Sequence, residues 1–228
     1  MVLAIVKKEL RETRVFAVLA LGLYLIYLSK LTGHWGRLLS SIFAWIPGMN
    51  AEPPDVPFVE GQFVTILFFI GAALAITLGF RQSAWEPSQG TAQYLLHLPL
   101  ARRTIFVTKL TTGISLLLGC TLIPILIYAI WAAMPATHAG PFEWSMTATA
   151  FDVWLLTPLG YLGAFASGIR PARWFGSRLL PLFSVALAGS ILAVVAQWSL
   201  IALPLLLLLL VVAVLVSDIL WEVETRDF

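Results

Sequence analysis

Few side chains in this sequence could catalyse a reaction or hold a metal ion. The three histidines, His34, His97 and His138, lie far apart and lack the spacing of metal ligands. No H-E-x-x-H or C-x-x-C pattern occurs, so neither a metal site nor an intramembrane protease is expected. None of the four lysines follows a glycine, so the phosphate-binding motif G-x-x-x-x-G-K-[ST] is missing. We therefore expect a chain that is not an enzyme and that binds no metal or cofactor itself.

Two acidic residues, Asp152 and Asp218, lie within or beside long apolar stretches. An acid at the depth of a bilayer can mark a translocation path, whereas an acid at a helix end more often reaches water. Asp152 is the stronger candidate for a translocation path, and both interpretations stay open. The other polar residues of these stretches are mostly Ser, Thr and Tyr, which suits an amphipathic, lipid-like or peptide substrate better than an ion.

One loop, GFRQSAWEPSQGTAQYLLHLPLARRTIFVTKL, has the pattern of a short helix at a membrane surface. Gly90 allows a tight turn, Thr91 is a good N-cap, and Pro99 ends the element after about two turns. The apolar side chains of this predicted helix are Tyr94, Leu95, Leu96 and Leu98, followed by Arg102 and Arg103. Such a helix can dock a soluble partner or only anchor the loop, and the pattern does not decide between them.

The amino-acid composition indicates the kind of secondary structure that must hold this loop in position. The 228 residues are 60% apolar and 11% charged, and the mean hydropathy is +0.92. Soluble domains carry about 25% charged residues, so much of this apolar surface must face lipid. We predict a single all-α domain, a polytopic helical membrane bundle of about six spans. The predicted spans are residues 15–31, 60–80, 104–132, 149–169, 178–196 and 201–217, and the boundary between the last two is the least defined.

The amphipathic segment 1–14 is predicted to be a retained helix in the membrane interface. With the N-terminus inside and six spans, 12 of the 14 Lys and Arg residues fall on the inner side. The positive-inside rule therefore places both termini and the loop at 86–102 in the cytoplasm, in a multi-pass protein of the cell (inner or plasma) membrane.

The loop also resembles the signature E-x-x-x-G-T-x-x-x-L-L-x-x-P-x-x-R of type-2 ABC (ATP-binding cassette) exporter permeases. The matching residues are Glu86, Gly90, Thr91, Leu95, Leu96, Pro99 and Arg102, with Lys109 beyond them. The N-terminal helix, the six-span order and the length are similar too. Two departures stand out: Pro87, Ser88 and Gln89 replace the charged residues that often follow the Glu, and Thr108 replaces a Gly that often precedes the Lys.

The resemblance implies a permease that pairs with a second permease chain, identical or related, and binds a separate cytoplasmic ATPase. Residues 91–98 would be the coupling helix in a groove of that ATPase, with Glu86 near the inner gate. ATP and Mg would bind the partner subunit, and no nucleic-acid partner is implied. Two alternatives remain: a membrane scaffold that holds a cytoplasmic partner without transport, and a small secondary carrier, although neither an acid pair nor a clear inverted repeat is seen.

Overall fold

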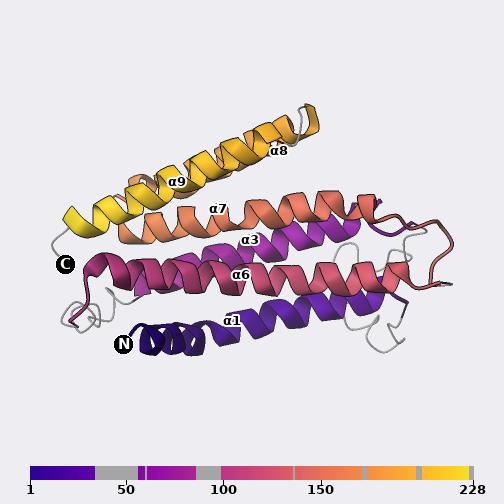
Figure 1. Ribbon diagram of the computed structural model, residues 1–228, viewed down its shortest axis with the longest axis horizontal. Coiled ribbons are helices and arrows are strands. Elements are labelled where there is room, and N and C mark those ends of the chain that lie inside the picture. The colour runs from indigo at the N-terminus through magenta and orange to yellow at the C-terminus, as the bar shows by residue number, and fades with distance from the viewer. Residues whose placement is uncertain are drawn as a thin grey trace.

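The protein is an all-α helical bundle in a computed structural model that describes residues 1–33, 56–59, 61–85, 99–135, 137–170, 174–198 and 202–225. The described residues contain no strand, which confirms the predicted all-α class. A 3-10 turn, η1 (Trp144–Thr147), precedes the fourth long helix. The long helices are α1 (Val2–Leu31), α3 (Gln62–Ser83), α6 (Arg102–Ala133), α7 (Ala148–Ile169), α8 (Phe175–Trp198) and α9 (Ala202–Thr225) (Figure 1).

Five of these helices are long and apolar enough to cross a membrane, namely α1, α3, α6, α8 and α9. The sixth, α7, carries Asp152, Thr157 and Pro158 in its first half. It packs against four other long helices, α3, α6, α8 and α9. A helix that is surrounded by other helices meets little lipid. It can therefore carry small and polar side chains that would be unfavourable on a face exposed to hydrocarbon.

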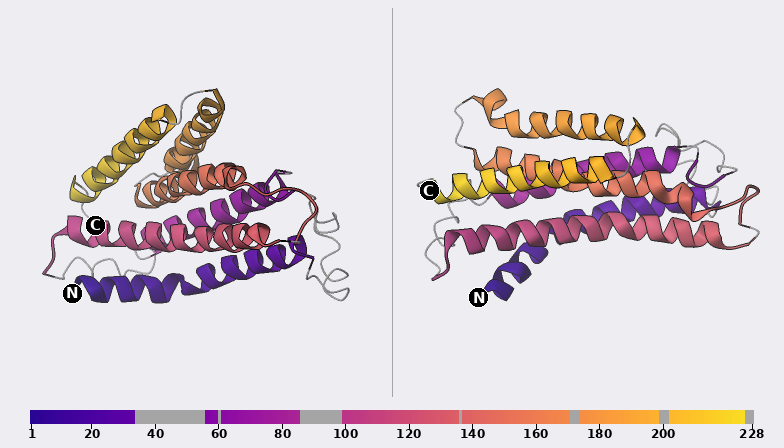
Figure 2. Two further views of the ribbon diagram at one scale, coloured as in Figure 1. Left: turned by 45° about the vertical axis from the view of Figure 1, so that its right-hand side comes forward. Right: turned by 45° about the horizontal axis from the view of Figure 1, so that its top comes forward.

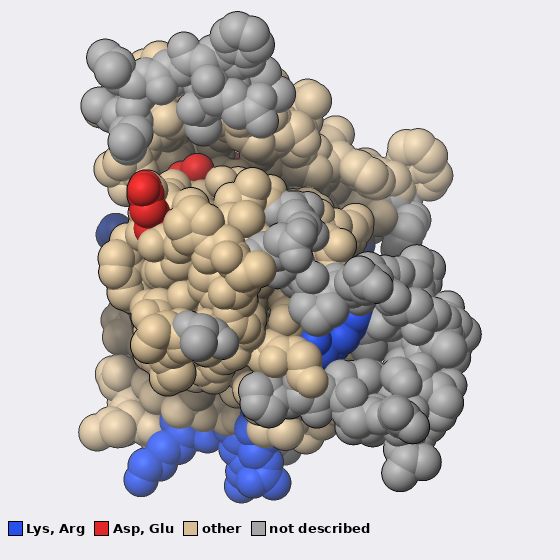
Figure 3. All heavy atoms as spheres, turned by 90° about the vertical axis from the view of Figure 1, so that its right-hand side faces the viewer, with Lys and Arg blue, Asp and Glu red and all other residues tan. Residues whose placement is uncertain are grey.

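Successive helices alternate in direction, so that both termini lie at one end of the bundle (Figure 1). The end of α3, the start of α6, the end of α7 and the start of α8 lie there too. Ten of the eleven described Lys and Arg residues belong to the helix halves nearest this end, and the exception is Lys30 at the other end of α1. Figure 3 looks at the opposite end, where most of the described surface is neither basic nor acidic.

The first helix is continuous from Val2 to Leu31, so the predicted boundary between an interfacial helix and a first span is not a break in the helix. Its first turns nevertheless lie at an angle to the rest (Figure 2, right). The hydroxyl of Thr13 donates a 2.7 Å hydrogen bond to the carbonyl oxygen of Glu9, one turn earlier. Back-bonding of this kind by threonine is one of the features that bend helices.

The closest helix pair is α3 and α7, and small residues make its contact. On α3 they recur every fourth residue, at Gly71, Ala75, Gly79 and Ser83. They face a matching series on α7, Gly160, Ala164 and Gly168. A Cβ added to Gly79 would lie 2.7 Å from both the Ala164 Cβ and the Tyr161 carbonyl oxygen. Series of small residues let helix backbones approach closely in membranes, where lipid provides no hydrophobic drive for association.

The last two helices form a hairpin that contacts the bundle mainly through α7. In Figure 2 (left) α8 and α9 stand apart from the other helices. Large apolar side chains such as Phe183, Leu187 and Leu209 are exposed along them. The sequence placed the turn between the predicted spans, at residues 197–200, and residues 199–201 lie outside the described residues.

Candidate functional site

Most of the predicted docking residues lie outside the described part of the chain. These are Glu86, Gly90, Thr91, Tyr94, Leu95, Leu96 and Leu98. The structure places Pro99 in an exposed bend and Arg102 at the exposed first turn of α6. The candidate site is therefore built from the residues on the two sides of the loop, which are described on α3 and α6.

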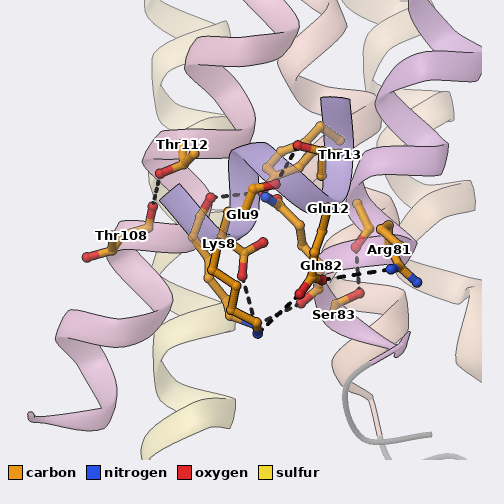
Figure 4. Close-up of polar contacts among 12 residues, drawn as sticks. Lys8, Glu9, Glu12, Thr13, Arg81, Gln82, Ser83, Thr108 and Thr112 are labelled. Carbon is orange, nitrogen blue, oxygen red and sulfur yellow. Dashed lines mark hydrogen bonds and ion pairs between the residues drawn. The ribbon is translucent and has the colours of Figure 1, made fainter. Parts of the chain in front are cut away.

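A buried ion pair lies where α6 begins. Lys109 Nζ is 3.6 Å from Glu9 Oε1 on α1, and each side chain is only 2% exposed. The same ammonium donates a hydrogen bond to the carbonyl oxygen of Gln82, 3.3 Å away near the end of α3. Burying two charges is costly unless they are paired and hydrogen-bonded, so this geometry holds the three helices at fixed positions. Figure 4 shows Glu9 and Gln82 at this junction.

A tyrosine of α7 completes the arrangement. The hydroxyl of Tyr161 donates a 2.5 Å hydrogen bond to Gln82 Oε1, and it lies 3.4 Å from the carbonyl oxygen of Lys109. Gly113 leaves the space for both side chains, because a Cβ there would collide with the Tyr161 hydroxyl and with Gln82 Oε1. We call Glu9, Gln82, Lys109 and Tyr161 the junction cluster; it joins α1, α3, α6 and α7.

A second, more exposed layer surrounds the junction cluster (Figure 4). Glu12 lies 3.8 Å from both Arg81 and Lys8, and these side chains are 22–30% exposed. The Arg81 guanidinium also lies 4.3 Å from the centre of the Trp85 ring, a cation–π contact at the last described residue before the loop. Partly exposed pairs contribute little to stability, so the buried pair is the one that orders this end of the bundle.

The junction cluster includes residues on both sides of the loop in the sequence. Gln82 precedes Glu86 by four residues, and Lys109 follows Arg102 by seven, so a displacement of either loop end reaches the cluster within two turns of helix. Through Glu9 and Tyr161 it also reaches α1 and α7. Sequence reasoning included Lys109 in the signature but missed its three partners. The available signals were an acid on the apolar-rich segment 1–14 and a glutamine at the end of α3, and neither reveals a pairing.

The second predicted feature, Asp152, lies on an exposed face of α7 near the opposite end of the bundle. It lines a groove with side chains of α8 and α9. Asp218 lies elsewhere, in a small pocket with Arg170 and Glu222. Within the described residues no group of three His, Cys, Asp or Glu side chains is arranged to hold a metal ion.

Comparison with models of known protein families, with curated proteins and with solved structures finds no match to this chain. The class that the fold itself defines is a multi-pass helical membrane protein with its basic residues gathered at one end.

Proposed function

We propose that this chain is the transmembrane subunit of an ATP-driven ABC exporter, with six spans that include α7. Two such permeases pair, as identical or related chains, and each binds a separate cytoplasmic ATPase that carries the ATP and Mg. The substrate is amphipathic, lipid-like or a peptide. Both termini and the loop at 86–102 lie on the cytoplasmic side of the cell membrane, the side that the basic residues favour.

The observation that carries this proposal is the junction cluster on the two sides of the signature-bearing loop. A loop that only anchored itself to the membrane would need no buried ion pair behind it. Here the ion pair between Glu9 and Lys109 and the hydrogen bonds of Gln82 tie both loop ends to α1 and α7. Such ties suit a loop that receives force and passes it into the bundle.

The mechanism follows from these ties. ATP binding closes the two partner ATPases, and residues 91–98 move with the ATPase surface to which they are docked. The ends of α3 and α6 are displaced together, because Lys109 bonds to the Gln82 carbonyl. The contacts of Glu9 and Tyr161 carry α1 and α7 along. The cavity between the two permeases then changes the side to which it opens.

A docking experiment tests the proposal. The chain is purified with the P-loop ATPase encoded nearest to it, and ATP hydrolysis is measured in lipid. The double variant Leu95→Asp/Leu96→Asp is expected to abolish co-purification and stimulation of ATP hydrolysis, because two charges cannot enter an apolar groove. The matched control is Gln93→Asp/His97→Asp, which adds the same charges four residues apart on the polar face of the predicted helix.

The control is expected to keep the complex and its ATPase stimulation. A complex that survives the Leu95→Asp/Leu96→Asp change would show that docking does not occur at this helix. A complex that forms but never stimulates ATP hydrolysis would favour the scaffold alternative. Transport that runs on an ion gradient without any ATPase would favour the carrier.

A further inference from the structure

A groove lies between α7 and the α8–α9 hairpin, in the half of the bundle away from the junction cluster. Its walls are apolar and include Val153 and Leu156 of α7, Leu192 of α8 and Leu208 of α9. It encloses about 470 Å³. Pockets that hold small ligands have volumes of about 300–1,000 Å³ and are lined mainly by apolar side chains with a few polar groups that fix orientation.

Asp152 provides the charge in this groove. Among the described residues it is the only charged one that lines the groove, where Thr149 is the other polar one. Its side chain is exposed, and none of the described residues forms a hydrogen bond or an ion pair with its carboxylate. A carboxylate on an apolar surface needs water or a partner of opposite charge, and such residues can mark ligand or ion sites.

We infer that this groove binds a monocationic amphiphile, with the cationic group against the Asp152 carboxylate and the apolar body along the leucine and valine walls. Charge complementarity selects this occupant, because an anion would be repelled and a neutral amphiphile would leave the carboxylate unpaired. If the proposed export function holds, this inference names the class of substrate that is exported. Transport of the cation rests on that proposed function, whereas binding of the cation to the groove does not.

The position of the groove connects it to the rest of the molecule. Asp152 and Tyr161 lie on the same helix, nine residues apart, which is about 14 Å along α7. Tyr161 belongs to the junction cluster, whereas the other walls of the groove belong to the loosely packed hairpin. A movement of α7 against the hairpin would therefore change the shape of the groove.

Binding is tested with tritiated tetraphenylphosphonium, a bulky apolar monocation, on the purified chain in lipid nanodiscs without any ATPase. The wild-type chain is expected to bind it saturably. Asp152→Asn is expected to weaken binding at least ten-fold, whereas Asp152→Glu, which keeps the charge, stays within about three-fold of wild type. Asp218→Asn is the matched control, because it removes an acid from another pocket and is expected to leave binding unchanged.

Neutral triphenylphosphine oxide is expected to compete at least ten-fold more weakly than unlabelled tetraphenylphosphonium. Equal competition by the neutral compound, or wild-type binding by Asp152→Asn, would overturn the inference. Each variant must also elute as wild type in size-exclusion chromatography, and the comparison of the neutral with the cationic competitor keeps the test valid if Asp152→Asn does not fold.

A second arm tests whether a zwitterionic membrane lipid, through its headgroup ammonium, competes with the monocation for the groove. Nanodiscs are made with phosphatidylethanolamine, whose headgroup carries an ammonium, or with phosphatidylglycerol, and each is compared with Asp152→Asn in the same lipid. Weaker Asp152-dependent binding in phosphatidylethanolamine would show that the groove accepts a lipid of zero net charge and would overturn the assignment to a monocation. Equal Asp152-dependent binding in both lipids would support that assignment, with a free cationic amphiphile as the occupant. Because no ATPase is present, failure here is distinguishable from failure of the docking test.

Discussion

The four-helix part of the molecule, α1, α3, α6 and α7, and the α8–α9 hairpin differ sharply in how far they are buried. Within the apolar segments of α1, α3 and α6, 39–44% of the residues are buried, against 11% in α8 and 6% in α9. The four-helix part also contains the junction cluster and the small-residue contact of α3 with α7. In the hairpin, large apolar side chains point away from the bundle.

This difference shows where specific contacts, rather than lipid, determine the arrangement. Lipid solvates an exposed leucine about as well as another helix does, so a helix face that meets lipid needs no matching surface. A charged or hydroxyl-bearing side chain in the same environment needs a partner at a defined distance. Single substitutions should therefore lower the stability of the protein when they lie in the four-helix part, and they should be tolerated in the hairpin.

The largest effect is expected from removing one partner of the buried ion pair. Lys109→Met leaves the Glu9 carboxylate buried without its ammonium, and the free energy of unfolding should fall by about 3–5 kcal/mol. The matched control Arg103→Met, at an exposed position of the same helix, should change it by less than about 0.5 kcal/mol. Thermal unfolding in detergent, followed by tryptophan fluorescence, measures both.

The double variant Glu9→Leu/Lys109→Met sharpens this prediction. With both charges removed, most of the lost stability should return, because apolar side chains can replace a buried ion pair. If the double variant is as unstable as Lys109→Met alone, the pair is not the reason for the loss.

A smaller but direct contrast comes from the same substitution in each region. Leu162→Ala opens a cavity at a fully buried position of α7 and should cost about 2–5 kcal/mol. Leu209→Ala removes a side chain of α9 that is 67% exposed, and lipid fills the space, so the melting temperature should hardly change. Equal losses in the two variants would mean that the hairpin packs as tightly as the four-helix part.

Adding one methyl group to a glycine tests the helix contacts. Gly79→Ala places a Cβ against the Ala164 Cβ and the Tyr161 carbonyl oxygen, which forces α3 and α7 apart and should cost about 1–3 kcal/mol. Gly189→Ala in α8 meets its nearest neighbouring atom, Leu159 Cδ1, at 3.9 Å and should be neutral or slightly stabilising. The melting temperatures of the two variants give the comparison, and a neutral Gly79→Ala would contradict the packing described here.

The smallest effect is expected from one hydroxyl group. Tyr161→Phe removes the hydrogen bond to Gln82 Oε1 while keeping the ring in place, and it should cost about 1 kcal/mol. Ser190→Ala, which removes a hydroxyl bonded within α8, serves as the control and should be close to neutral. If both changes prove equal, the hydroxyl of Tyr161 is no more important than an ordinary helix-internal one.

Much of the helical framework could be predicted from the sequence, because each helix is a local run of apolar residues. The predicted segment 104–132 lies within α6 (Arg102–Ala133), and 149–169 nearly coincides with α7 (Ala148–Ile169). The predicted boundary at residue 14 was less accurate, because α1 changes direction within one continuous helix and has no break there. The docking helix at 91–98 stays a prediction, because those residues lie outside the described part of the chain.

The sequence by itself determined that the chain is a helical membrane protein and which helix ends carry its basic residues, because hydropathy and charge are properties of local segments. Only the tertiary structure decided that Glu9 meets Lys109, that the small residues of α3 face those of α7, and that Asp152 lines an apolar groove. These relations depend on which helices are neighbours and how each is rotated about its axis. Helix packing sets both quantities, and no run of residues within one helix specifies them.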